Sequence, residues 1–265
     1  MAGYSFINRS VAVIAIGDYT MTSRNEPWYN GGEDYGNQKA VLPLKEPPMT
    51  IIAAMRESDA SILIASDTEG TEEGGIRLNN RRKLRHHPHA PIAWGCSGNI
   101  TIGIEDFAPW LESYNWPPAD WRTFRRQTTE TLAKLNAEQR QLVQLSGVRL
   151  QESDTANCLL VGWLNHPEIY EFNDRGIATA YWERGFQAIG TGKLYAWTAY
   201  KTLQHCDGLE PLQVMMIIMH IVVTTAPECG FPYHIWRVTE KGITTGLEEE
   251  KQEWQIEKKI YNRSL

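Results

Sequence analysis

The chain has 265 residues and a formal net charge of −6, with 42% hydrophobic and 22% charged residues. This length suits one large domain or two small ones, and the composition is ordinary for a globular protein. The acidic balance argues against a nucleic-acid-binding surface, which needs a basic stripe. The best membrane candidate, Val214–Met219, is interrupted at His220 and is too short to cross a bilayer. We therefore expect a protein that binds neither nucleic acid nor membrane.

The four cysteines are widely spaced and form no Cys-x-x-Cys pair. This spacing favours reduced thiols in a cytoplasmic protein over a disulfide framework. The run His86-His87-Pro88-His89 is rich in metal-ligand side chains, but its proline breaks the spacing of a helix face or of a usual zinc site. We therefore expect no metal and no cofactor.

The chain changes character near residue 49. Residues 17–48 are rich in Gly, Pro, Asn and acidic side chains and show no sustained period. Such a stretch is typical of a leader, a propeptide or an extended arm. We expect such a segment over residues 1–48, a folded domain over residues 49–247 and a charged, solvated tail over residues 248–265.

The first half of the folded domain contains strand patterns followed by a helix. Two apolar runs, Thr50–Met55 and Ser61–Ser66, flank a polar turn and predict a buried hairpin. Arg81–Leu84 and Ile92–Cys96 are further strand candidates. Asp120 is placed to cap a helix in which apolar residues recur at three- and four-residue spacing.

The second half contains more strands and two helices. The predicted strands are Cys158–Leu164, Ile169–Phe172, Ala178–Trp182, Gln187–Ile189 and, at the end of the domain, Tyr233–Thr239. Helices are predicted over Lys193–His205 and Pro211–Thr225, and the second is so apolar that it needs cover on more than one side. Two helix layers outside a two-sheet core, or burial at a subunit interface, would provide that cover. The pattern predicts a layered α/β domain that oligomerises.

Several short segments carry side chains or turns of the kinds found in catalytic or binding sites. Thr50 opens a buried strand, Asp67 closes the next strand and Lys83 lies in a basic segment beyond it. Small-residue turns follow at Gly95-Cys96-Ser97-Gly98 and Ile189-Gly190-Thr191-Gly192. Each feature alone has an ordinary structural explanation, such as a solvated charge or a tight turn.

Together and in this order, the segments resemble one family. The similarity to the N-terminal half of proteasome β-type subunits and their bacterial relatives rests on Met49-Thr50-Ile51-Ile52, Ile64-Ala65-Ser66-Asp67-Thr68, Arg82-Lys83-Leu84 and Gly95-Cys96-Ser97-Gly98. The later run Ala188–Ala196 resembles the matching turn and helix of the bacterial peptidase partner of an ATP-driven unfoldase. The resemblance implies an N-terminal nucleophile hydrolase with an α+β fold, a four-layer αββα sandwich of two antiparallel sheets between helix layers.

The resemblance also implies a catalytic role for each matched residue. Thr50 would be the nucleophile, with its own α-amine as the base, because an α-amine has a pKa of about 8. Lys83 would favour the alkoxide, and Asp67 would keep Lys83 charged and oriented. The Gly98 N–H would donate to the oxyanion. Thr191 stands where the family usually has a serine near the amine.

Substrate and partners follow from the same resemblance. Thr71 matches a position whose backbone lines the substrate cleft, and we assign Ser97 to substrate binding as well. The implied activity is a threonine-type endopeptidase in the cytoplasm, formed after removal of residues 1–49. Its implied partners are a peptide or unfolded protein substrate, further copies in a homo-oligomeric ring and an ATP-dependent unfoldase.

Several residues depart from the family pattern. The interval from Thr50 to Asp67 is slightly longer than usual, and an alignment that places Met49 at the catalytic position would describe a dead enzyme. Glu69 replaces a typical arginine and Ala226 a typical aspartate. Retention of both Asp67 and Lys83 favours an active enzyme, because a buried lysine destabilises a protein unless it has a role.

The start of the mature chain decides between active and inactive forms. Residues 1–48 are a propeptide removed by self-cleavage, or Met49 is the true start and is removed, or the segment is a retained arm that forbids catalysis. The alternatives to the peptidase are an inactive proteasome-like scaffold or binding subunit and an amidase that acts on small molecules.

Overall fold

The computed structural model describes residues 50–71, 77–78, 82–99, 101–150, 154–226 and 229–246. All of these lie in one structural unit, Lys45–Leu265. The predicted leader over residues 1–48, the position of Met49 and the predicted tail over residues 248–265 lie outside the described residues.

The first sheet has five strands in the order β10-β1-β2-β11-β12, and every pairing is antiparallel. Its strands are β1 (Ile52–Ser58), β2 (Ser61–Asp67), β10 (Phe186–Ile189), β11 (Tyr233–Thr239) and β12 (Gly242–Thr244). β1 and β2 form the predicted hairpin, in which Ile52 pairs with Ser66 on one side and with Ile189 of β10 on the other. The sheet thus aligns the start of β1 with the ends of β2 and β10.

The second sheet has five strands that follow one another in chain order. They are β5 (Leu84–His86), β6 (Ile92–Gly98), β7 (Ala156–Trp163), β8 (Pro167–Phe172) and β9 (Ala178–Ala180). A separate two-stranded ladder joins β3 (Gly70–Thr71) to β4 (Arg77–Leu78). The expected strand at Arg81–Leu84 is shifted, because its ladder with β6 starts only at Leu84 and continues to His86.

The helices are α1 (Ala108–Glu112), α2 (Trp121–Leu145), α3 (Lys193–Leu203) and α4 (Pro211–Thr225). The predicted cap is present: Asp120 accepts a hydrogen bond of 2.6 Å from the Thr123 N–H at the start of α2. Before α1 lies a π-helix, η1 (Thr101–Phe107). The sequence pattern did not reveal η1 and α1, because both are too short to show a helical period.

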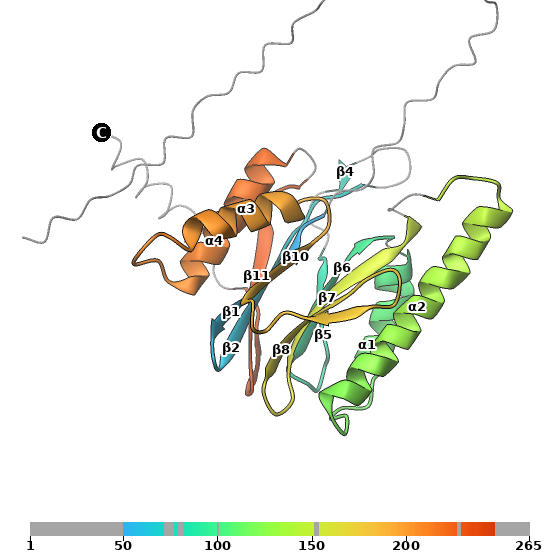
Figure 1. Ribbon diagram of the computed structural model, residues 1–265, viewed down its shortest axis with the longest axis horizontal. Coiled ribbons are helices and arrows are strands. Elements are labelled where there is room, and N and C mark those ends of the chain that lie inside the picture. The colour runs from blue at the N-terminus through green and yellow to red at the C-terminus, as the bar shows by residue number, and fades with distance from the viewer. Residues whose placement is uncertain are drawn as a thin grey trace, which may run out of the picture. The chain divides into compact units, whose positions relative to one another are not determined.

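Alternating strand side chains divide the interior into three apolar cores. Ile51, Ala53 and Leu63 face α3 and α4, whereas Ile52, Ala54, Ile62 and Ile64 face the other sheet. Trp94, Cys158 and Leu160 of the second sheet face α1 and α2. The two sheets therefore lie between two helix layers (Figure 1), which confirms the predicted αββα sandwich.

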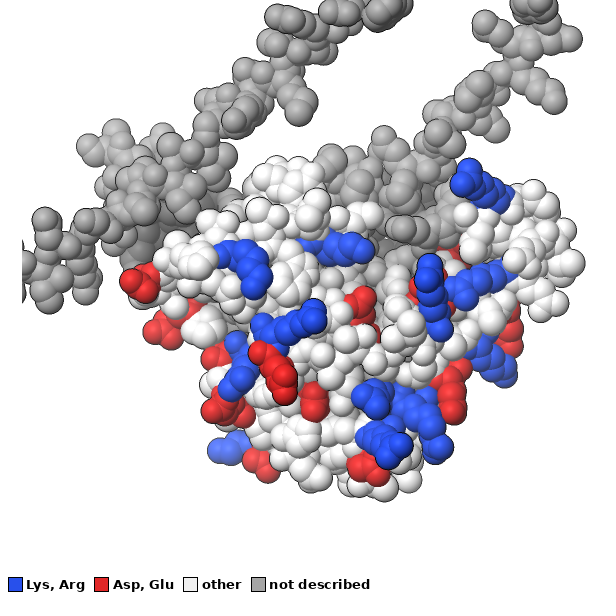
Figure 2. Space-filling model, in the orientation of Figure 1, with Lys and Arg blue, Asp and Glu red and all other residues white. Residues whose placement is uncertain are grey.

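α4 is covered on part of its surface within this chain, and Leu212, Val214, Ile217 and Ile221 stay only partly buried. It packs against α3 and against strands β1 and β2, and it buries Met215, Ile218, Met219 and Val222. Among the described residues, no helix combines the length and the apolar character needed to cross a membrane. The face seen in Figure 2 carries acidic and basic side chains that are interspersed.

Candidate functional site

Thr50, Asp67 and Lys83 meet at one end of the first sheet. Thr50 lies just before β1, Asp67 is the last residue of β2, and Lys83 immediately precedes β5. The Lys83 Nζ donates hydrogen bonds to the Thr50 Oγ1 at 2.9 Å and to the Asp67 Oδ1 at 2.7 Å. The structure therefore brings together the three residues that the sequence nominated as nucleophile, orienting acid and neighbouring cation.

Asp67 is held from several directions. The Ile51 N–H donates to its Oδ1 at 3.1 Å and the Gly230 N–H to its Oδ2 at 3.4 Å. Asp67 is 0% exposed and Lys83 is 7% exposed, so the ion pair is almost completely removed from water. Burial raises the pKa of Asp67 above its usual value, while the Lys83 charge and the two backbone donors lower it. These contacts fix the ammonium beside the Thr50 hydroxyl.

The turn after β10 contacts the backbone of Thr50. The Thr50 N–H donates to the Thr191 Oγ1 at 3.2 Å, and the Gly192 N–H donates to the Thr50 carbonyl at 3.4 Å. Gly190 has φ +87°, and a Cβ at this position would clash with the Thr50 carbonyl oxygen. Sequence reasoning nominated Thr191 but took Gly190 only as part of a tight turn. The contact between this glycine and Thr50 is visible only in three dimensions.

The end of β6 approaches the same turn. A Cβ built on Gly190 would lie 3.5 Å from the Ser97 Cβ, so Ser97 borders the turn that holds Thr50. Gly98 follows with φ +92°, and a Cβ there would clash with the Thr155 carbonyl oxygen. Its partner across the ladder is Ala156. The predicted positions Ser97 and Gly98 therefore lie on the strand end that faces the Thr50 side of the molecule.

Asn136 of α2 anchors the strand beside Gly98. Its Nδ2 donates to the Ala156 carbonyl at 2.9 Å, and the Ala156 N–H donates back to its Oδ1 at 2.8 Å. Asn136 is fully buried on a helix whose other buried residues are mostly apolar. Sequence reasoning missed this residue. The only available signal was a polar side chain at a core-facing position of the predicted helix.

No described contact joins Thr71 to Thr50 or to the residues around it. Its backbone lies in β3 and pairs with Arg77 of β4, and its side chain lies outside the described part of the structure. The assignment of Thr71 to the substrate cleft stays a prediction.

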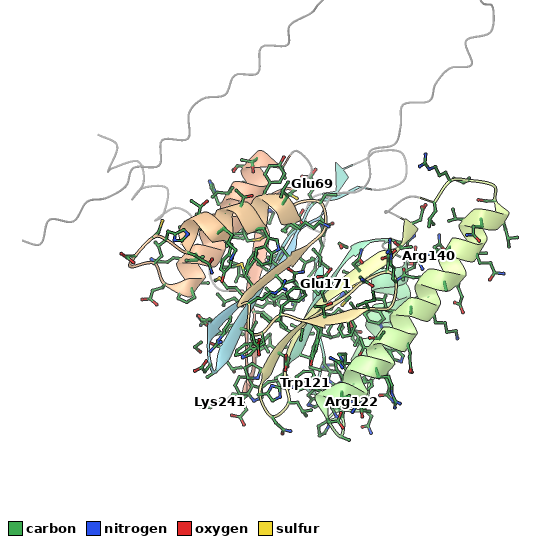
Figure 3. The ribbon with its side chains drawn as sticks, in the orientation of Figure 1. Glu69, Trp121, Arg122, Arg140, Glu171 and Lys241 are labelled. Carbon is green, nitrogen blue, oxygen red and sulfur yellow. The ribbon has the colours of Figure 1, made fainter. Side chains whose placement is uncertain are left out.

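The two positions that depart from the family pattern are both buried. Glu69 lies so close to Gly230 that a Cβ there would clash with the Glu69 Oε2 (labelled in Figure 3). Ala226 is part of the apolar core beneath α4. The Gly230 backbone therefore has two contacts: its N–H donates to Asp67, and Glu69 packs against it.

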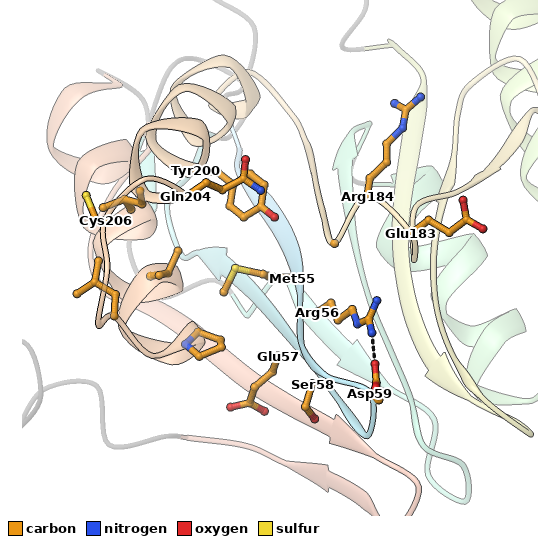
Figure 4. A pocket seen from close by; sticks show the side chains of 15 residues that line it. Met55, Arg56, Glu57, Ser58, Asp59, Glu183, Arg184, Tyr200, Gln204 and Cys206 are labelled. Atoms are coloured by element: carbon orange, nitrogen blue, oxygen red, sulfur yellow. Dashed lines mark hydrogen bonds and ion pairs between the residues drawn. The ribbon is translucent and has the colours of Figure 1, made fainter.

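A further cavity lies away from these residues. A pocket of about 720 Å³ borders Met55, Arg56, Glu57 and Ser58, at the opposite end of β1 from Thr50 (Figure 4). Arg56 and Asp59, which form an ion pair, are among its lining residues. We place the candidate chemistry at Thr50 because the buried charges converge there and not at this cavity.

Among the described residues, no group of three or more His, Cys, Asp or Glu side chains is arranged to hold a metal ion.

Comparisons with known proteins bear on the fold. No protein-family model matches this sequence, and no curated protein matches it either. A solved structure of eukaryotic HslV from Trypanosoma brucei is similar with a TM-score of 0.50 and 19% identity, covering 72% of this chain and 99% of that chain. Anbu (ancestral beta-subunit) from Yersinia bercovieri is similar with a TM-score of 0.63 and 17% identity, covering 80% of this chain and 94% of that chain. The neighbours confirm that this chain has the fold of the proteasome β-type group, as its sequence resemblance implied.

Proposed function

We propose that this chain is a threonine-type endopeptidase in which Thr50 acts as an N-terminal nucleophile. The observation that carries the proposal is the position of the Lys83 ammonium, 2.9 Å from the Thr50 hydroxyl and held at 2.7 Å by Asp67. A buried ion pair contributes little net stability to a fold, because the desolvation of the two charges offsets most of their Coulombic attraction. A charge held next to a hydroxyl at a strand end is better explained by chemistry.

The mechanism requires a free amine at Thr50. While Met49 is attached, the Thr50 nitrogen is an amide and cannot accept a proton. Release of residues 1–49 turns it into an α-amine with an ordinary pKa of about 8, which is a base suited to neutral pH. The Thr191 hydroxyl, 3.2 Å from this nitrogen, would then orient it.

The bond-making step follows from these positions. The amine takes the proton of the Thr50 hydroxyl while the Oγ1 attacks the carbonyl carbon of the scissile peptide bond. The Lys83 charge stabilises the oxygen during attack, and the Gly98 N–H donates to the oxyanion, a contact typically worth about 3 kcal/mol. Proton return to the departing amine leaves an acyl ester on Thr50. Water then hydrolyses this ester and regenerates the free hydroxyl.

The proposed substrate is a peptide or an unfolded protein segment. The proposed assembly is a homo-oligomeric ring in the cytoplasm, to which an ATP-dependent unfoldase delivers the substrate. The similarity to HslV and to Anbu supports an assembly of this type. A closed compartment would also keep an unspecific peptidase away from other proteins.

The test is the mature N-terminus together with peptide hydrolysis. The full chain is purified, its intact mass is measured and fluorogenic peptides are offered as substrates. We expect a chain that begins at Thr50 and hydrolyses the peptides, and we expect Thr50→Ala to abolish hydrolysis with an unchanged circular dichroism spectrum. Thr198→Ala on the exposed face of α3 is the matched control and should leave the rate unchanged. Unaltered hydrolysis by Thr50→Ala would refute the assignment.

An inactive proteasome-like scaffold is the second candidate. The observations in its favour are Met49 directly before Thr50 and the two departures at Glu69 and Ala226. A chain that keeps its full mass and hydrolyses neither peptides nor small amides would establish this candidate in place of the peptidase.

A further inference from the structure

Two cysteines face each other across neighbouring strands of the second sheet. Cys96 of β6 and Cys158 of β7 are direct partners in the antiparallel register. The two strands lie side by side within the layer next to α1 and α2 (Figure 1). Both side chains belong to the apolar core on that side of the sheet, on the opposite face of β6 from Ser97.

The hydrogen-bond pattern shows which kind of pair they form. The N–H and the carbonyl of Ala156 both bind Asn136, so Ala156 does not exchange backbone hydrogen bonds with its ladder partner Gly98. Hydrogen-bonded and non-hydrogen-bonded pairs alternate along an antiparallel ladder. Cys96 and Cys158 lie two positions along and are therefore also a non-hydrogen-bonded pair.

This kind of pair brings its side chains closest together. Its Cα atoms are typically about 4.5 Å apart, inside the range of roughly 4.4–6.8 Å that disulfides span. The Cys158 thiol lies close enough to Cys96 for that neighbour to help raise its pKa. No large backbone movement is needed to join the two sulfur atoms.

The two thiols differ in their exposure. Cys158 is fully buried, whereas Cys96 is partly exposed. Burial, together with the neighbouring Cys96 thiol, raises the pKa of Cys158, so Cys158 stays protonated at neutral pH. The helix η1 packs directly over Cys96, since a Cβ on Gly103 would lie 2.7 Å from the Cys96 Cβ. Although η1 packs against it, Cys96 is the more exposed of the two thiols, so a small oxidant reaches it before Cys158.

We propose that Cys96 and Cys158 form a redox modification site, a dithiol that a peroxide converts into a cross-strand disulfide. The Cys96 sulfur attacks one peroxide oxygen, the O–O bond breaks, and Cys96 becomes a sulfenic acid as water leaves. The Cys158 sulfur then displaces the hydroxyl group of the sulfenic acid. A second water leaves and the S–S bond forms. Two thiols are oxidised and one hydrogen peroxide is reduced to two waters.

The site adjoins the candidate active centre along one strand. Cys96 and Gly98 are on β6, and their partners Cys158 and Ala156 are on β7. A disulfide would join β6 to β7 next to the residue proposed to hold the oxyanion. Exposed disulfides are more easily reduced than buried ones, and Cys96 is partly exposed.

Peroxide treatment of the reduced full chain tests this proposal without any use of peptidase activity. The protein is freed of reductant, exposed to hydrogen peroxide, blocked with an alkylating agent, and examined by intact mass and peptide mapping. We expect the chain to lose the mass of two hydrogen atoms and to yield one cross-linked peptide pair containing Cys96 and Cys158. Dithiothreitol should reverse both changes.

Variants separate this pair from the other thiols. In Cys158→Ala, peroxide should leave a sulfenic acid at Cys96 that dimedone captures, whereas Cys206→Ser should behave like the unaltered chain. Irreversible oxidation of Cys96 without a cross-link, or no change at either residue, would overturn the proposal. Because the mapping is done first on the unaltered chain, a variant that fails to fold leaves the conclusion intact.

Discussion

Two pairs of reactive side chains in this molecule differ in charge and in surroundings. At the end of the first sheet, Asp67 and Lys83 form a charged pair with almost no exposure to water. Within the second sheet, two thiols lie opposite each other at an apolar core, with Cys158 fully buried and Cys96 partly exposed. Burial raises the pKa of Asp67 and of Cys158 alike, but only Asp67 has a nearby cation and backbone donors that lower it again.

The difference shows what each pair contributes to the fold. A buried thiol behaves as a small apolar side chain, so it fits a core without assistance. A buried carboxylate and ammonium must each find partners, and even then apolar residues would serve stability as well or better. The charges of Asp67 and Lys83 therefore need a functional explanation. The two thiols suggest a function only because the strand register places them directly opposite each other.

The largest expected effect comes from removing the cation. Lys83→Met leaves Asp67 buried without its partner and should lower the free energy of unfolding by about 3–5 kcal/mol. Cys158→Ala removes one small apolar group and should lower it by about 1 kcal/mol. Urea unfolding followed by circular dichroism measures both. The double variant Lys83→Met with Asp67→Leu should recover most of the lost stability and remain inactive. Equal losses from Lys83→Met and Cys158→Ala would break the contrast between the two pairs.

An intermediate effect is expected at Gly190, which supports Thr50 but carries no charge. Gly190→Ala forces a methyl group against the Thr50 carbonyl, and the resulting displacement should lower kcat/KM by about 100-fold. Gly208 has a similar φ of +82° with nothing within 4 Å of a built Cβ, so Gly208→Ala carries the same backbone strain without the clash. We expect Gly208→Ala to keep its activity in the peptide assay. If both variants lost activity equally, strain rather than contact with Thr50 would be the cause.

The smallest effect is expected at Thr191, an exposed side chain that makes one hydrogen bond to the Thr50 nitrogen. Thr191→Val keeps the shape but removes the acceptor, and should lower the hydrolysis rate of the processed enzyme by about threefold to tenfold. Thr191→Ser restores the hydroxyl and should recover the rate. Steady-state kinetics on chains of verified N-terminus provide the measurement. A valine variant as fast as the original would remove Thr191 from the proposed site.

The sequence indicated more of the fold than of the site's supporting contacts. Strand periodicity predicted the β1–β2 hairpin and β11, and an apolar run with an initial proline predicted the bounds of α4. Thr50, Asp67 and Lys83 were nominated because their spacing resembles a known family, and they meet in space. The short elements η1 and α1 escaped prediction because they contain too few residues to show a period.

The sequence by itself determined the order of most helices and strands, since local periodicity is a property of the linear chain. Its resemblance to a known family implied the four-layer arrangement and the three residues that converge at the start of β1. Only the tertiary structure decided which backbone groups hold Asp67, why Gly190 must lack a side chain, and that Cys96 lies opposite Cys158. The physical reason is that these contacts join segments distant along the chain. Their distances follow from strand register and from the packing of one sheet on another, and neither can be read from the order of residues within a single strand.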